Sequence, residues 1–373
     1  MTTPLHNLLE QMIQKNASDL ILTEGQPPTL RLVGDLKPVD GLPALTPEKI
    51  WELAGELVTE EQRKVFEREQ ELDLSFGIQG RARFRVNIFR QRGSAGVVIR
   101  LLPFEIPTLE SLGVPEVVKR WLLVPHGIII ITGPTGSGKS TTQAGMIGFL
   151  NERKPYHVVT IEDPIEFTHP HGTCTIEQRE VGKDTQSFGH ALRHVFRQSP
   201  DVIMIGEMRD LETFETALQL AETGHLVLAT LHTGDATQAI SRIVDVFPAE
   251  QHQQVRVQLS HSLIGVLVQQ LVPTVNGRGR VLATEILEAN PAVRNLIRKN
   301  ELSQIYSIIQ TSSGEGMFTM NSALLRLFRD GKISLEQAML FTTRQKELEQ
   351  LASRETKIPL FVKEHQLAGV GAK

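Results

Sequence analysis

The stretch Gly133-Pro-Thr-Gly-Ser-Gly-Lys139-Ser140-Thr141 decides the fold of this 373-residue chain. It fits the pattern G-x-x-x-x-G-K-[ST], in which glycines let backbone N–H groups turn toward phosphate oxygens. The apolar run His126–Thr132 predicts a buried parallel strand before the loop, and residues 140–152 predict a helix after it. A strand, a glycine-rich loop and a helix in this order predict a nucleoside triphosphate site. An ordinary glycine turn is the alternative, and the complete set of signature residues disfavours it.

Each residue of the loop is expected to contribute to nucleotide binding. Lys139 should reach the β- and γ-phosphates, and the Ser140 hydroxyl should bind Mg²⁺. The start of the following helix adds the positive end of its dipole. We therefore predict ATP and Mg²⁺ as the ligands, and the predicted binding residues are Gly133, Pro134, Thr135, Gly136, Ser137, Gly138, Lys139, Ser140 and Thr141.

The bulk composition is typical of a soluble globular protein, with 40% hydrophobic and 22% charged residues. The net charge of -4 argues against a dedicated nucleic-acid binder, so no nucleic-acid partner is expected. The single cysteine, Cys174, excludes an intramolecular disulfide and a cysteine-based zinc cluster. We find neither an apolar stretch of about 18 residues nor the layout of a signal peptide, and therefore expect a cytoplasmic protein.

The first part of the chain, residues 1–103, has the pattern of a smaller α+β domain. Helices are expected over residues 5–13 and from the capping pair Thr46-Pro47 onward. Strands are expected near residues 18–23 and 29–33, with a hairpin closed at Gly34-Asp35, and an antiparallel meander at 72–76, 82–89 and 96–102. A linker is predicted at residues 104–111.

From about residue 110 strands and helices alternate, which predicts a parallel sheet wrapped by helices. The strands are expected at residues 128–132, 158–161, 202–205, 226–231 and 279–287. The chain becomes mostly helical after about Pro291. We predict that the α/β domain with its helical C-terminal part spans residues 112–345, and that a polar tail follows at 346–373.

Carboxylates follow two of the predicted strands. Glu162, Asp163 and Glu166 come after residues 158–161, and Glu207 comes after residues 202–205. In a parallel sheet these strand ends meet at one edge, where carboxylates can face Mg²⁺ and the attacking water. Solvated strand-to-helix turns are the alternative for both groups.

Two histidines bracket the predicted strand 226–231. His225 precedes the strand and His232 follows it, so either histidine could approach a phosphate at its end. A hydrogen-bonded structural role is an equally good explanation from spacing alone.

Arginines concentrate on the meander of the first domain. Arg83 and Arg85 are two residues apart and share one strand face, and Arg100 lies on the last strand. Such a face could supply arginines that stabilise charge on a transferring phosphoryl group. A solvated strand face is the alternative. A face for single-stranded nucleic acid would need aromatic residues among the arginines, and Phe84 lies on the opposite side.

Taken together, these motifs resemble those of the secretion-type RecA-like hexameric ATPases, and within them the type IV pilus retraction motors. The resemblance runs from Ser18 to about residue 345. It rests on the phosphate loop, the acidic box Thr160–Glu166, the Walker B segment Asp201–Asp210, the histidine box Glu222–His232, and Ala292-Val-Arg-Asn-Leu-Ile-Arg298, which is similar to a retraction-specific motif. Extension motors and type II secretion motors carry a four-cysteine zinc site, which one cysteine cannot form.

The resemblance implies a PAS-like first domain, a RecA-like P-loop ATPase domain and a ring of six subunits. It implies that Glu166 is the catalytic carboxylate, with Glu162 as a rival, and that Glu207 holds Mg²⁺ through water. It also implies that His225, in a box completed by His232, senses the γ-phosphate. The arginines that it would aim at the nucleotide are Arg85, Arg100 and, as a further candidate, Arg83.

The resemblance further implies ATP hydrolysis coupled to pilus retraction, with an inner-membrane pilus platform protein as partner at the inner face of the cytoplasmic membrane. Residues 133–138 and 294–297 look like the principal motor, whereas residues 197–206 and 269–273 look like the accessory one. An accessory ATP-binding subunit that depends on a paralogous motor is therefore the alternative. A nucleic-acid translocase on the same fold is a third hypothesis, which the net charge disfavours.

Overall fold

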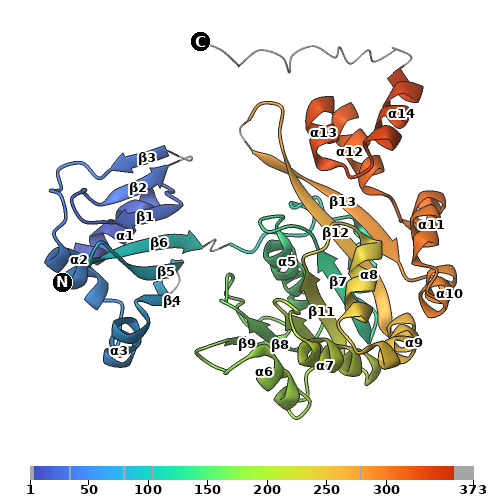
Figure 1. Cartoon of the computed structure of the whole chain (residues 1–373), viewed down its shortest axis with the longest axis horizontal. Helices are drawn as coiled ribbons and strands as arrows, with labels where there is room; N and C mark the ends of the chain where they lie inside the picture. Colours follow the sequence, from blue (N-terminus) through green and yellow to red (C-terminus); the bar gives the residue numbers. More distant parts are fainter. Residues whose placement is uncertain (1–3, 33–34, 79–80, 103–104, 278, 357–373) are drawn as a thin grey trace. The chain divides into compact units, whose positions relative to one another are not determined.

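The computed structural model describes residues 4–32, 35–78, 81–102, 105–277 and 279–356 (Figure 1). The chain forms two compact units. The first comprises Met1–Ile106 together with Pro164–His169, and the second comprises Pro107–Asp163 and Pro170–Lys373. The turn predicted at residue 34, part of the predicted linker and the end of the predicted tail lie outside the described residues.

The N-terminal unit is built on an antiparallel sheet in the order β3-β2-β1-β6-β5-β4. Its strands are β1 (Asp19–Leu22), β2 (Thr29–Leu32), β3 (Asp35–Pro38), β4 (Glu71–Ile78), β5 (Ala82–Gln91) and β6 (Ser94–Leu102). The alternating residues of β4 to β6 produce the predicted meander. The fold is the smaller PAS-like α+β fold that the sequence predicts.

Three helices accompany this sheet: α1 (Pro4–Gln14), α2 (Pro47–Gly55) and α3 (Glu60–Glu69). One face of α1 is apolar and buried in the core of the unit. Helix α2 begins as expected, because Thr46 Oγ1 accepts a hydrogen bond from Lys49 N at 3.3 Å and Pro47 occupies the first turn. The charged helix α3 buries only Phe66, so its apolar periodicity is weak and the sequence did not indicate it.

The second unit contains a seven-stranded sheet in the order β13-β12-β7-β11-β10-β8-β9. Its strands are β7 (Gly127–Thr132), β8 (His157–Glu162), β9 (Thr175–Glu180), β10 (Val202–Ile205), β11 (Leu226–Leu231), β12 (Leu263–Pro273) and β13 (Arg280–Glu288). Neighbouring strands are parallel from β12 to β9, which agrees with the prediction. The strand predicted at residues 279–287 is not parallel as expected: β13 is antiparallel to β12, because a short connection returns the chain directly along the same edge.

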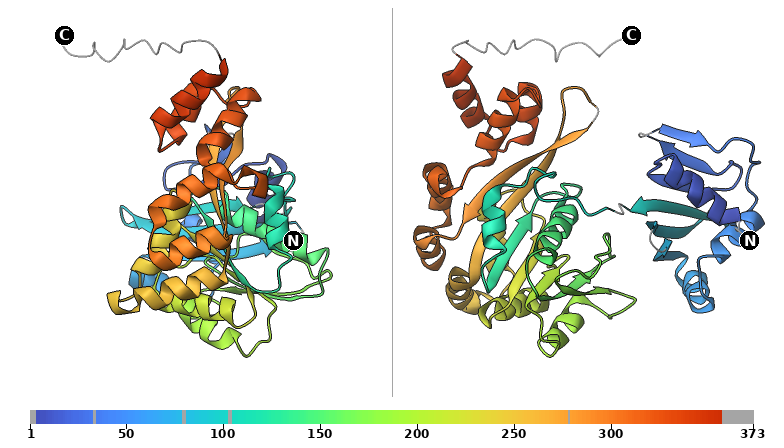
Figure 2. Two further views of the ribbon diagram at one scale, coloured as in Figure 1. Left: turned by 90° about the vertical axis from the view of Figure 1, so that its right-hand side faces the viewer. Right: turned by 180° about the vertical axis from the view of Figure 1, so that it is seen from behind.

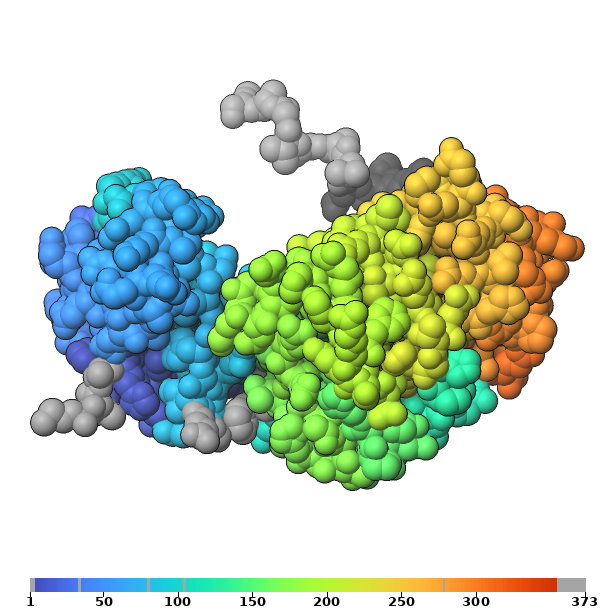
Figure 3. Space-filling model, turned by 90° about the horizontal axis from the view of Figure 1, so that it is seen from below, coloured from blue at the N-terminus to red at the C-terminus, as the bar shows by residue number. Residues whose placement is uncertain are grey.

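Helices cover both faces of this sheet. Alternate side chains of β7 enter opposite cores, Ile128 and Ile130 on one face and Ile129 and Ile131 on the other. The second of these cores is shared with α4 (Glu116–Trp121) and α5 (Lys139–Asn151). The first core is shared with α6 (Phe188–Val195), α7 (Leu211–Glu222), α8 (Ala236–Asp245) and α9 (His252–Ser262). Figure 3 shows a surface of this unit to which α6, α7 and α9 contribute. This is the RecA-like arrangement that the sequence predicts.

The C-terminal helices gather beside β12 and β13 in Figure 1 and in the right-hand view of Figure 2. They are α10 (Pro291–Lys299), α11 (Ile305–Thr311), α12 (Met320–Arg329), α13 (Leu335–Phe341) and α14 (Gln345–Thr356). Helix α14 covers the start of the predicted polar tail, yet Leu348 and Ala352 are fully buried in the core. The beginning of the predicted tail therefore packs on the domain through these two apolar residues. The charged residues around them make this apolar pattern hard to recognise in the sequence. None of the helices in the described ranges combines the length and the apolar character that a membrane crossing needs.

Candidate nucleotide site

The phosphate loop lies at the carboxyl edge of the seven-stranded sheet. It connects β7 to α5, and β11 runs parallel beside β7 with Leu231 opposite Thr132. Because β8 and β10 are parallel to these strands, the residues that follow all four strands meet at this edge.

Three glycines give the loop its shape. Gly133, Gly136 and Gly138 have φ angles of 150°, 78° and 88°, which residues other than glycine rarely adopt. A Cβ on Gly133 would lie 2.2 Å from the carbonyl oxygen of Gln269 and 2.8 Å from Ser137 Oγ. No atom lies within 4 Å of the Cβ position of Gly136. Buried Ser137 Oγ has no hydrogen-bond partner among the described residues. The loop thus offers an open concave backbone and a spare hydroxyl, which fits a polyphosphate.

Lys139 occupies the centre of this loop. Its Nζ donates to the carbonyl oxygens of Gly133 at 2.9 Å and Pro134 at 3.1 Å. The same atom lies 3.5 Å from His232 Nδ1. The ammonium group is therefore held inside the loop, where the strand-to-helix connection brings backbone N–H groups and positive charge together.

Glu207, which follows β10, is linked to His232, which follows β11. Glu207 Oε1 lies 3.0 Å from His232 Nε2, and its Oε2 lies 2.6 Å from Arg209 Nη2. Burial alone would raise the pKa of Glu207, but hydrogen bonds and positive charge from Arg209 and His232 outweigh it and lower that pKa. The imidazole of His232 therefore lies between the carboxylate of Glu207 and the ammonium of Lys139.

The two histidines of the sequence pattern lie at opposite ends of β11. His232 follows the carboxyl end and lies with the loop, whereas His225 precedes the amino end. His225 Nδ1 lies 3.1 Å from the carbonyl oxygen of Leu220 and 3.3 Å from Thr223 Oγ1. The structure therefore brings His232, and not His225, together with Lys139 and Glu207 in this unit.

The two candidate catalytic carboxylates belong to different units. Glu162 ends β8 in the second unit, and its Oε1 accepts hydrogen bonds from Thr160 Oγ1 at 2.6 Å and Gln178 Nε2 at 3.0 Å. Glu166 is half-buried in the segment Pro164–His169, which belongs to the N-terminal unit. The carboxylate of Glu162 is thus committed to two side chains of its own sheet.

The three candidate arginines lie on β5 and β6 of the N-terminal unit. Arg85 is directly opposite Arg100 in the strand register. Arg100 Nε lies 2.8 Å from Oδ1 of Asp19, a carboxylate that is only 4% exposed. Arg83 donates to the carbonyl oxygen of Ile165 at 3.0 Å and to Ser75 Oγ at 3.2 Å. Asp19 was not identified from the sequence, because its pairing with Arg100 depends on strand register.

Buried polar residues brace the loop and α5 against the sheet, and no role there was predicted for them from the sequence. Gln269 Nε2 donates to Thr142 Oγ1 at 2.8 Å, and Gln143 Nε2 donates to the carbonyl oxygen of Ile205 at 3.2 Å. Thr132 Oγ1 accepts from Thr233 N at 2.9 Å. The sequence offers a signal for two of these residues, because Thr142 and Gln143 are polar residues on the buried face of the helix predicted at residues 140–152.

A central phosphate loop, a carboxylate after the strand β10 and a histidine after β11 on this sheet define a RecA-like P-loop ATPase. Residues 4–278 match the family model described as type II/IV secretion system protein. The chain belongs to this family.

Named relatives cover nearly all of the chain. The type IV pilus retractation ATPase PilT of Pseudomonas aeruginosa is 49% identical over 331 residues, which are 89% of this chain and 96% of that protein. The type IV pilus ATPase PilU of the same organism is 44% identical over 332 residues, covering 89% and 87% of the two chains. A crystal structure of the pilus retraction motor PilT with bound ADP is similar at a TM-score of 0.88 and 48% identity, covering 94% of this chain and 100% of that one.

Proposed function

We propose that this ATPase couples ATP hydrolysis to the retraction of type IV pili. The observation that carries the proposal is the contact of Lys139 and Glu207 with His232 at the phosphate edge, on a chain whose relatives are named for pilus retraction. Every residue that the loop needs to hold a triphosphate is present.

The loop residues Gly133–Thr141 bind the phosphates through their backbone N–H groups. On ATP binding, Lys139 exchanges its two carbonyl partners for β- and γ-phosphate oxygens, which gives stronger charge-assisted bonds. His232 then faces the γ-phosphate while remaining beside Glu207. Bound Mg²⁺ would be held by the Ser140 hydroxyl and, through water, by Glu207, and would offset negative charge on the transferring phosphoryl group.

Glu166 is the residue that we assign to the attacking water. The assignment is supported by the two hydrogen bonds that already engage Oε1 of its rival Glu162. Glu166→Gln should therefore reduce ATP turnover about 100-fold or more, in the range of a lost general base, and leave ATP binding intact. Glu162→Gln should mainly destabilise the sheet, because it breaks a buried hydrogen-bond network. Unchanged turnover in Glu166→Gln would overturn the assignment.

The proposed active form is an assembly of several copies of this chain. Six subunits form a ring, in which Arg85, Arg100 and Arg83 of the N-terminal units contribute positive charge at the nucleotide. The ring acts at the inner face of the cytoplasmic membrane on an inner-membrane pilus platform protein. The mass of the particle with bound ATP, measured in solution, tests the ring of six.

The accessory role is the second candidate, and the 44% identity to the ATPase named PilU favours it. In that role the chain binds ATP but pulls only beside a paralogous retraction ATPase. Pilus retraction in cells that carry this gene as their sole retraction ATPase decides between the two roles. Retraction by this chain alone supports the independent motor, and retraction that requires the paralogue supports the accessory subunit.

A further inference from the structure

Glu285 on β13 is a buried carboxylate that binds the first residues of two helices. Its Oε1 accepts a hydrogen bond from Ala236 N, the start of α8, at 3.0 Å. Its Oε2 accepts one from Met320 N, the start of α12, at 3.3 Å. The residue is only 3% exposed. A single side chain therefore accepts a hydrogen bond from the first backbone N–H of each of two helices, α8 and α12.

The helix on one side of Glu285 begins at the phosphate edge. Only residues 233–235 separate His232, which contacts Glu207, from the start of α8 at Ala236. Thr233 is bonded to Thr132 at the end of β7, and Asp235 Oδ1 accepts from Gln238 N at 2.8 Å to cap α8. A shift of His232 toward a γ-phosphate therefore acts on the first turn of α8 through a short, hydrogen-bonded connection.

The helix on the other side belongs to the C-terminal part. Asn321 of α12 donates to the carbonyl oxygen of Arg344 at 3.1 Å. The Arg344 guanidinium lies 3.7 Å from the ring centroid of Tyr306, and Tyr306 donates to Glu347 of α14 at 2.7 Å. Helices α11, α12 and α14 are thus joined by one connected set of polar contacts.

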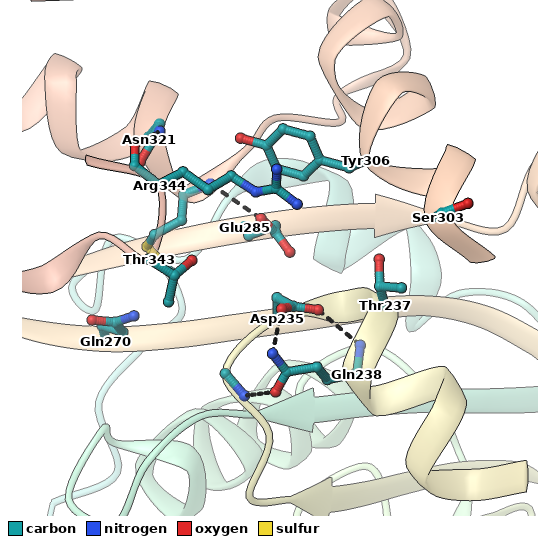
Figure 4. A pocket seen from close by; sticks show the side chains of 12 residues that line it. Asp235, Thr237, Gln238, Gln270, Glu285, Ser303, Tyr306, Asn321, Thr343 and Arg344 are labelled. Carbon is teal, nitrogen blue, oxygen red and sulfur yellow. Dashed lines mark hydrogen bonds between the residues drawn. The ribbon is translucent and has the colours of Figure 1, made fainter. Parts of the chain in front are cut away.

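A pocket of about 150 Å³ separates these two sets of contacts. Figure 4 shows Glu285 in it, with Asp235 on one side and Arg344 and Tyr306 on the other. A close-packed interior leaves little room for a side chain to change position. A pocket of this size gives the side chain that room. Glu285 therefore has both the contacts and the space to follow one helix or the other.

We propose that Glu285 is a positioning residue that couples the nucleotide state of the phosphate edge to the C-terminal helices through α8 and α12. The inference rests on the proposed ATPase cycle, in which His232 responds to the γ-phosphate. When the connection 232–235 shifts, the Glu285 carboxylate follows the N–H of Ala236, and its hydrogen bond from Met320 N weakens or breaks. The start of α12 then has two discrete arrangements, as a switching element requires.

Amide hydrogen exchange tests this coupling directly. The full-length chain is compared at saturating ADP and at saturating non-hydrolysable ATP analogue, and the readout is protection in the first turn of α12. The wild type should show exchange rates that differ between the two states by about fivefold or more, the lower range of ordinary coupling energies. In Glu285→Gln the difference should shrink to within about twofold, since an amide NH₂ cannot accept from a backbone N–H.

Glu285→Gln should still fold, because Ile286 N donates to the carbonyl oxygen of Phe318 at 2.9 Å and holds the start of α12 independently. A second variant, Met320→Pro, removes the backbone donor together with the methionine side chain, at a position where helices accept proline. Its matched control, Met320→Ala, makes a similar cut to the side chain but keeps the N–H. The nucleotide-dependent difference should be lost in the proline variant and kept in the alanine variant.

Two results would overturn the coupling: equal protection of α12 in both nucleotide states of the wild type, or an undiminished difference in Glu285→Gln and Met320→Pro. Hydrolysis of ATP is measured on the same preparations. A wild type that does not hydrolyse ATP contradicts the proposed function, whereas a wild type that hydrolyses ATP without exchange differences contradicts only the coupling.

Discussion

His232 Nε2 lies 3.0 Å from Oε1 of Glu207, and this contact joins the ends of the strands β10 and β11. The opposite ring nitrogen lies 3.5 Å from Nζ of Lys139. One imidazole therefore connects the acidic and the basic group that the phosphate edge presents. Any change at the phosphates that draws Lys139 away alters the environment of Glu207 through this ring.

The position of His232 predicts unequal effects for the two histidines. His232→Asn should lower the turnover number for ATP about 100-fold, comparable to the loss of one donor aimed at transition-state charge. His225→Asn should change it by less than about twofold, because its ring bonds to Leu220 and Thr223 at the other edge of the sheet. Steady-state ATPase assays on both variants measure this, and a larger loss in His225→Asn would contradict the placement.

The ion pair of Glu207 predicts a shift in the pH profile. Arg209 holds the pKa of Glu207 below its ordinary value, so the carboxylate stays charged in mildly acidic solution. In Arg209→Gln that effect is lost while the opposing effect of burial remains, and the pKa of Glu207 should rise. The acidic limb of the turnover profile should then move to higher pH.

Arg193 offers a matched control for this experiment. It forms an ion pair of similar length with Glu212, at 2.7 Å, and the Glu212 side chain is more exposed than that of Glu207. Arg193→Gln should leave the acidic limb in place. An acidic limb that is unmoved in Arg209→Gln would show that Glu207 does not set it.

The close approach of Gly133 to β12 predicts a severe effect of a single methyl group. In Gly133→Ala the new Cβ would lie 2.2 Å from the carbonyl oxygen of Gln269, so the loop must shift. Since misplacement of about 1 Å at a binding site can cost about 100-fold, the affinity for ATP should fall by at least tenfold. Gly182→Ala is the control, because its φ of 83° imposes similar strain in open space away from the loop. Equilibrium binding of a fluorescent ATP analogue compares the two.

The packing of α14 predicts that the start of the predicted tail contributes to stability. Leu348 is fully buried, so Leu348→Ala should lower the free energy of unfolding of the second unit by about 2–5 kcal/mol. Leu340 on neighbouring α13 is 80% exposed, and Leu340→Ala should change it by no more than about 0.5 kcal/mol. Chemical denaturation of both variants gives the comparison. Equal effects would mean that α14 is not docked in solution.

Much of the fold could be predicted because its signals are local. The phosphate loop is defined by consecutive residues, and the apolar runs at β7, β8, β10 and β11 are bounded by polar turns. Strand β12 was missed because it follows α9 without a break: the helix ends at Ser262 and the strand begins at Leu263. The nearest glycine, Gly265, lies inside the strand, so the local pattern places no boundary at Leu263.

The site divides in the same way. Lys139 and Glu207 follow from motifs, but Gln269, Asp19 and Glu285 act through partners that lie tens of residues away along the chain. Their roles depend on strand register and helix placement, which periodicity does not determine. The placement of His225 and His232 was easier to predict, because residues that follow the carboxyl end of a parallel strand lie at the same edge of the sheet as the phosphate loop.

Gly133 packs so closely against β12 that a Cβ on it would lie 2.2 Å from the carbonyl oxygen of Gln269. The phosphate-loop motif therefore depends on residues outside itself. The nine residues contain the whole sequence motif, but they do not determine the shape of the loop by themselves. The loop packs against a strand, β12, that follows more than a hundred residues later in the chain. A fragment that stopped before β12 would keep the whole signature and lose the surface against which it is shaped. The loop is therefore not a transferable module, and its chemistry is a property of the finished sheet.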